Sequence, residues 1–174
     1  MTPSLPAAVR PVLIGAATGL RSQWGMAALS LSSPPSADSS PVRRIVSGPW
    51  VRRMVMTAAA GEFIADKSPG VPGRLSWPGL VPRLVLGAVA GALVARRYPG
   101  EPTAVAASRG SAAAFVGAGA GVLWRRLGGP LLHADGLAAV LEDAVAAALA
   151  WAAVGNGPPS TGGGKSGPAA QTHR

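Results

Sequence analysis

The chain has no cysteine among its 174 residues, and charged residues make up only 13% of it, against about one quarter in soluble proteins. The missing cysteines exclude disulfide frameworks, thiolate nucleophiles and Cys-ligated zinc or iron–sulfur sites. Two histidines occur, and His173 stands next to the end of the chain, so a zinc site built on paired histidines is also excluded. We therefore expect no catalytic residues, no cofactor and no enzyme activity.

Apolar and small residues take the place of the missing charge: 48% of the chain is hydrophobic and 24 residues are glycine. The apolar residues gather in segments of roughly the length that a helix needs to cross a bilayer. The sequence thus predicts an all-α, polytopic transmembrane bundle in the cell membrane, with the lipid bilayer as its main partner. We place about five apolar segments, at 11–31, 49–66, 79–95, 103–124 and 136–154.

We expect one membrane domain over residues 11–154, a short N-terminal tail over 1–10, and a disordered C-terminal tail over 155–174. The C-terminal stretch is rich in Gly, Pro and Ser and has no apolar periodicity. Small residues at intervals of four, such as Gly15 with Gly19 and Gly87 with Gly91, let helix backbones approach closely. These faces predict tight packing between segments, and homo-oligomers through the same Gly/Ala faces.

Formal net charge is +9, and many of the cations stand as arginine pairs beside the apolar segments. Such pairs are typical of anchors at the membrane interface, where anionic lipid attracts them. Their scattered placement does not form the basic stripe of a nucleic-acid interface, so we expect no nucleic-acid partner.

Four carboxylates fall where apolar sequence normally excludes them. Glu62 and Asp66 stand four residues apart in AAAGEFIADKSPGVPG, so on a helix they share one face and repel each other unless a cation or proton compensates. Glu142 and Asp143 lie inside the last apolar segment. These four residues are the candidate ion or proton site.

Three cations are the candidate counter-charges: Arg21, Lys67 and Arg109. Arg21 is the middle residue of the segment 11–31, where an arginine costs on the order of 3 kcal/mol on insertion scales. Arg109 is also flanked by small residues in an apolar segment, so the two halves of the chain look alike. Two interpretations stay open here: an inverted repeat, and a chance likeness between two low-complexity stretches.

Three interpretations of the inner charges follow from this pattern. In the first, the carboxylates form a pathway by which a small solute or ion crosses the membrane. In the second, they form structural ion pairs with Arg21 and Arg109, and the protein is a membrane scaffold or assembly partner. In the third, the paired acids hold Mg²⁺ or Mn²⁺, although we name no metal ligand on this pattern alone.

GEFIADKSP, PRLVLGA and LEDAVA carry a resemblance to a known family. Over about residues 10 to 154 the chain resembles a bacterial family of small integral membrane proteins that carry a domain of unknown function. The matching positions are Glu62, Asp66, Lys67, Pro69, Arg83, Gly87, Glu142 and Asp143. The resemblance implies a membrane location and brings no activity with it.

Overall fold

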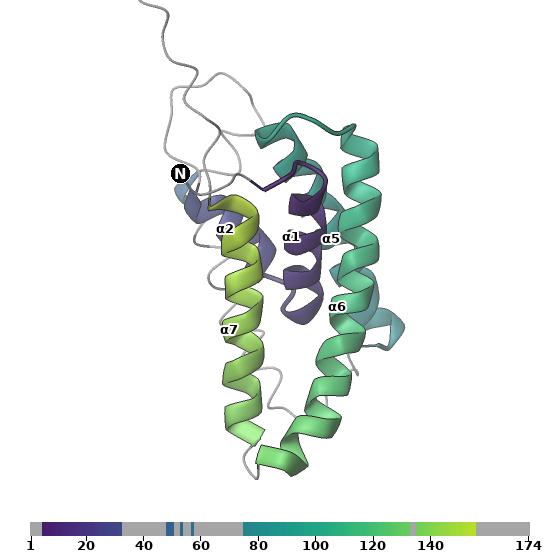
Figure 1. The fold of residues 1–174 in the computed structure, drawn as a ribbon, viewed down its shortest axis with the longest axis vertical. Coiled ribbons are helices and arrows are strands. Elements are labelled where there is room, and N and C mark those ends of the chain that lie inside the picture. The colour runs from purple at the N-terminus through teal and green to yellow at the C-terminus, as the bar shows by residue number, and fades with distance from the viewer. Residues whose placement is uncertain are drawn as a thin grey trace, which may run out of the picture.

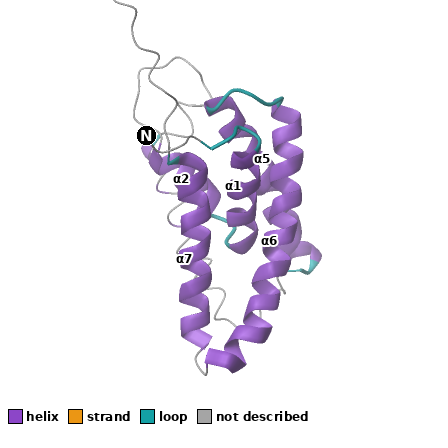
Figure 2. Ribbon diagram, viewed as in Figure 1, coloured by secondary structure: helices purple, strands orange, loops and turns teal. Residues whose placement is uncertain are grey.

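The described part of the protein is helical, in agreement with the all-α expectation. In this computed structural model the described residues are 5–32, 48–50, 53, 57, 75–132 and 135–155. Within these ranges there is no strand, and short loops join the helices (Figure 2). The bounded helices are α1 (Val9–Leu20), α2 (Trp24–Ser32), α5 (Trp77–Arg97), α6 (Thr103–Leu132) and α7 (Asp135–Val154).

The first apolar segment is not the single helix that the sequence predicts. Helix α1 ends at Leu20, Arg21 takes an extended backbone with φ −141° and ψ 114°, and α2 begins at Trp24. The turn satisfies its own backbone, because the Arg21 N–H donates to the Ala17 carbonyl and its own carbonyl accepts from the Trp24 N–H. Gly19 stands just before the turn, and glycine is a weak helix former. The prediction of one helix over 11–31 is therefore wrong, and the break falls at its arginine.

The two short helices form a hairpin that enters and leaves the bundle at the same end. Three contacts fix this arrangement, because they tie the start of α1 and the end of α2 to the ends of α5 and α7. They are Arg10 Nη1 to the Ala153 carbonyl at 2.7 Å, Arg97 Nη1 to Ser32 Oγ at 2.7 Å, and Tyr98 Oη to the Val154 carbonyl at 2.7 Å. The chain thus turns back between α1 and α2, at Arg21, instead of crossing the bundle. Figure 1 shows the two short helices beside α7.

Small residues let α1, α5 and α6 pack backbone to backbone. A Cβ atom added at Gly15 or Gly19 of α1 would meet the backbone of Gly110 or Ala114 in α6, and one added at Gly87 of α5 would lie 2.7 Å from the Gly110 carbonyl oxygen. Helix α1 consequently lies in the middle of the bundle, between α7 on one side and α5 and α6 on the other (Figure 1). The glycine spacings seen in the sequence are used here between helices of one chain.

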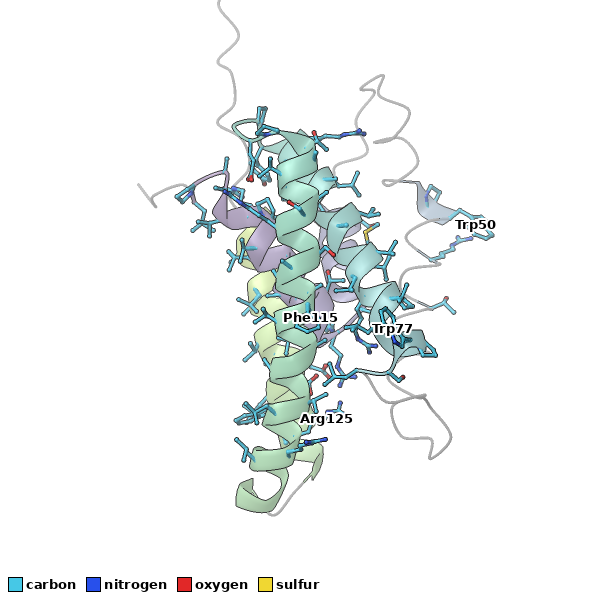
Figure 3. All side chains as sticks on the ribbon, turned by 90° about the vertical axis from the view of Figure 1, so that its right-hand side faces the viewer. Trp50, Trp77, Phe115 and Arg125 are labelled. Carbon is cyan, nitrogen blue, oxygen red and sulfur yellow. The ribbon has the colours of Figure 1, made fainter. Side chains whose placement is uncertain are left out.

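Two helices in the described ranges are long and apolar enough to cross a membrane, namely Trp77–Arg97 and Gly136–Val154. Helices α1 and α2 have 12 and 9 residues, so each is too short to span a hydrocarbon core of about 30 Å. Large apolar side chains also face outward, among them Trp77 and Phe115, which are 78% and 56% exposed (Figure 3). An exposed apolar surface of this kind suits contact with lipid or with a partner.

Candidate charge site inside the bundle

The turn between α1 and α2 places a buried arginine against α7. Arg21 is 4% exposed, and its Nε donates to Asp143 Oδ1 at 2.5 Å. Asp143 lies eight residues after the start of α7 and eleven before its end, or about 12 and 16 Å along a helix. The ion pair therefore sits near the middle of a helix that is long enough to cross a membrane.

Glu142, the neighbour of Asp143, has a different arginine. Its Oε2 accepts a hydrogen bond from Arg125 Nε at 2.9 Å, and the Glu142 side chain is only 1% exposed. Trp124 Nε1 donates to the Ala138 carbonyl at 2.9 Å. The adjacent residues Trp124 and Arg125 of α6 thus bond to positions of α7 that are about one turn apart. Two consecutive acids of α7 thus pair with two arginines from different elements, one from the hairpin turn and one from α6.

Sequence reasoning missed the role of Arg125. The segment 103–124 was expected to end at Trp124, which made Arg125 and Arg126 an anchor pair beside a loop. In the structure α6 continues to Leu132, so Arg125 is a helical residue that can point inward while Arg126 is exposed. The signal was the apolar Leu127 and Leu131 beyond the arginines, which the glycines and proline between them obscured.

Arg83 of α5 is a further buried cation, near the level of Arg21 in the bundle. It is 8% exposed, and its Nη1 donates to the Gly79 carbonyl at 2.7 Å. One turn further along α5, Gly87 packs on Ala114, which also lies against Gly19 near the hairpin turn. The arginines of α5 and of the hairpin turn therefore approach the same layer.

Arg109 does not join these charges. Its Nη1 lies 2.9 Å from Glu101 Oε1, and its side chain is 44% exposed, whereas that of Glu101 is 6% exposed. Arg109 lies in the second turn of α6 and Glu101 two residues before its first residue, at the end of the bundle where α5 finishes. The expectation that Arg109 is a counter-charge of the inner carboxylates is thus corrected. Its partner is Glu101, just before the N-terminus of its own helix, where the helix dipole also favours a negative charge.

The remaining predicted site residues, Glu62, Asp66 and Lys67, lie outside the described residues, as does most of the expected segment 49–66. In the ranges that are described, no group of three or more His, Cys, Asp or Glu side chains is close enough to hold a metal ion. The described site is therefore a set of paired charges, Arg21 with Asp143 and Arg125 with Glu142.

Comparison with known proteins yields no match to a family model, a curated protein or a solved structure. The resemblance to a family of small membrane proteins stays a prediction, and the chemistry of the site has to be argued from its own geometry.

A buried charge of this kind is stable inside a protein only when its partner of opposite charge is present. Removing a charge from water is costly, and the attraction between partners offsets the cost only when the geometry is good and the remaining polar atoms are satisfied. An ion or polar solute that reaches the site can exchange with one partner of a pair. The arrangement can therefore bind a charged group by substitution, and it can equally serve as a fixed structural bond.

Proposed function

We propose that this protein is a small multi-pass protein of the cell membrane that moves a small solute or ion through a site at the turn of the α1–α2 hairpin. The observation that carries the proposal is the position of Arg21: a break in an apolar helix, buried, and paired with Asp143 about halfway along a membrane-length helix. Glu142 and Arg125 extend the site, and we include Glu62 and Asp66 as its further carboxylates.

A hairpin that reaches only halfway supports a transport function. Helix α1, with 12 residues, is about 18 Å long, close to half of a hydrocarbon core of about 30 Å. Interrupted helices at membrane depth occur where backbone is buried in protein or lines a polar cavity, and in many transporters they form the substrate site near the midplane. A bundle that served only to span the membrane would have no need for such a break.

The charges give the second line of support. A single arginine or aspartate at the centre of a membrane helix costs about 2.5–3.5 kcal/mol on insertion scales, and such residues commonly mark pathways or relays. In our mechanism a cation or proton reaches the Glu142–Asp143 pair from one side, loosens the Arg21–Asp143 contact, and leaves to the other side when the arginine returns. The hairpin turn is the element that moves.

Flux in proteoliposomes tests the proposal. The quadruple variant Glu62→Gln, Asp66→Asn, Glu142→Gln and Asp143→Asn removes charge and keeps shape, so it should insert but lose pH- or cation-dependent flux. Arg126→Gln is the matched control, because Arg126 is an exposed cation of α6 next to the site arginine. Unchanged flux in the quadruple variant would end the transport proposal.

A scaffold function is the second candidate, and one observation favours it. Glu142 and Asp143 of α7 each already have an arginine partner, and close glycine contacts pack α1, α5 and α6 together beside them. A scaffold needs the ion pair, but it does not matter which of the two positions carries the positive charge. The exchange Arg21→Asp with Asp143→Arg should then preserve insertion and phenotype, whereas a transport site should fold and lose flux.

A further inference from the structure

An apolar groove of about 410 Å³ runs along the outside of the bundle between α2 and α7. Trp24 and Leu31 of α2 and Trp151 of α7 form its walls, and alanines of both helices, among them Ala147 and Ala148, line it. Its volume falls within the range of about 300–1,000 Å³ that is usual for ligand pockets. Every lining residue is apolar, so the groove offers its occupant shape and apolar contact.

The groove runs from the level of the hairpin turn to one end of the bundle. Trp24 lies three residues after Arg21, at the level of the hairpin turn, and Leu31 stands beside Ser32, at the end of the bundle where α2, α5 and α7 finish. Seven residues separate Trp24 from Leu31, about 10 Å along a helix. Since one leaflet contributes about half of a 30 Å hydrocarbon core, the groove lies within the depth of a single leaflet.

Positive charge stands at the outer end of the groove. Arg97 donates from Nη1 and Nη2 to the hydroxyl and the carbonyl of Ser32, the residue next to Leu31. These partners are neutral, so the guanidinium keeps its full charge at this end. Arg96 beside it is exposed. A negatively charged group at the groove mouth would therefore meet the guanidinium of Arg97, with Arg96 next to it in the chain.

We propose that the groove holds an acyl chain of an anionic phospholipid, whose phosphate binds Arg96 and Arg97. The inference rests on the membrane location in the proposed function but not on transport. A second copy of the chain suits the groove less well. Copies that insert with the same orientation would bring their arginine-rich ends to the same side of the membrane, where like charges repel, whereas an anionic lipid neutralises them.

Spin-labelled lipid tests this assignment. The full chain is reconstituted in phosphatidylcholine vesicles with a trace of phosphatidylglycerol or phosphatidylcholine that carries a nitroxide on its acyl chain, and the motionally restricted fraction is measured. We expect phosphatidylglycerol to be held over phosphatidylcholine by about fivefold for each arginine that contributes. Arg96→Gln with Arg97→Gln should abolish this preference, and Arg126→Gln, at the far part of α6, should leave it intact.

A second variant separates the groove from the charges. Ala147→Leu with Ala148→Leu fills the groove and should lower the restricted fraction of both lipids, while Ala120→Leu, an exposed alanine of α6, should not. Equal restriction in the filled and parent chains would overturn the inference, as would loss of a cross-linked dimer on filling with no change in lipid contact. Alkaline carbonate extraction is run alongside: release of the chain would refute the membrane location itself, whereas a retained chain without lipid preference would refute only the inference.

Discussion

Arg21 and Arg109 look equivalent in the sequence and differ in backbone conformation, burial and the position of their acidic partner. Each is flanked by small residues inside an apolar segment, as ATGLRSQWG and VAASRGSAA show. Arg21 ends a helix, is buried and reaches across the bundle to Asp143, while Arg109 lies within the continuous helix α6, is 44% exposed and pairs with nearby Glu101.

The difference shows that whether a helix breaks or continues at such an arginine goes with the position of the acid that it pairs with. A residue in an unbroken helix can reach only what its helix face meets, and Arg109 pairs with an acid just before the start of its own helix. Arg21 contacts an acid 122 residues away, and the extended turn that carries Arg21 places its side chain for that contact. One half of the apparent repeat is therefore a hairpin and the other a straight helix.

The largest effect should come from Asp143→Asn. The change leaves a buried guanidinium opposite a neutral group, and breaking a buried ion pair typically costs about 3–5 kcal/mol. We expect a loss of stability near the lower end of that range, because Arg21 has other contacts as well. Reversible unfolding in mixed micelles measures it. A cost equal to that of Glu101→Gln would show that the two arginines are equivalent after all, and a smaller cost would reverse the contrast between them.

Helix content and close packing could be predicted from the sequence because both depend on local pattern. Apolar segments of membrane length gave α5 and α7 close to their observed bounds, and the Gly15–Gly19 and Gly87–Gly91 spacings marked faces that do pack closely. The break at Arg21 could not be predicted in this way. The turn at Arg21 comes with a partner in α7 that a local window does not contain.

The candidate site was predicted in part for the same reason. Charges inside apolar segments stand out in the sequence because inserting them into a membrane costs free energy. This criterion selected Arg21, Glu142 and Asp143, which are buried or partly buried in the structure and form ion pairs. Which arginine meets which acid is a property of the tertiary arrangement. Arg125 was missed because its helix runs on through two glycines and a proline, residues that normally signal a loop.

Packing around the hairpin gives the next effect in size. Gly19→Ala places a Cβ against the backbone of Ala114, and overpacking of this kind costs about 1–3 kcal/mol. Gly119→Ala is the matched control, because nothing lies within 4 Å of a Cβ added there. It should be neutral or stabilise α6 by up to about 1 kcal/mol, the difference in helix propensity. The same unfolding assay compares them, and equal costs would refute the close contact between α1 and α6.

The smallest effect is expected at the Arg109–Glu101 pair. Arg109→Gln removes one partner of an ion pair whose arginine is nearly half exposed, and exposed pairs contribute about 0–1 kcal/mol. The chain should insert, unfold within that margin of the parent and keep its flux, whereas Arg21→Gln should lose stability and flux together. Measuring both variants in the same vesicles tests the contrast directly. If Arg109→Gln abolished flux while the chain remained folded, the start of α6 would have to be included in the pathway.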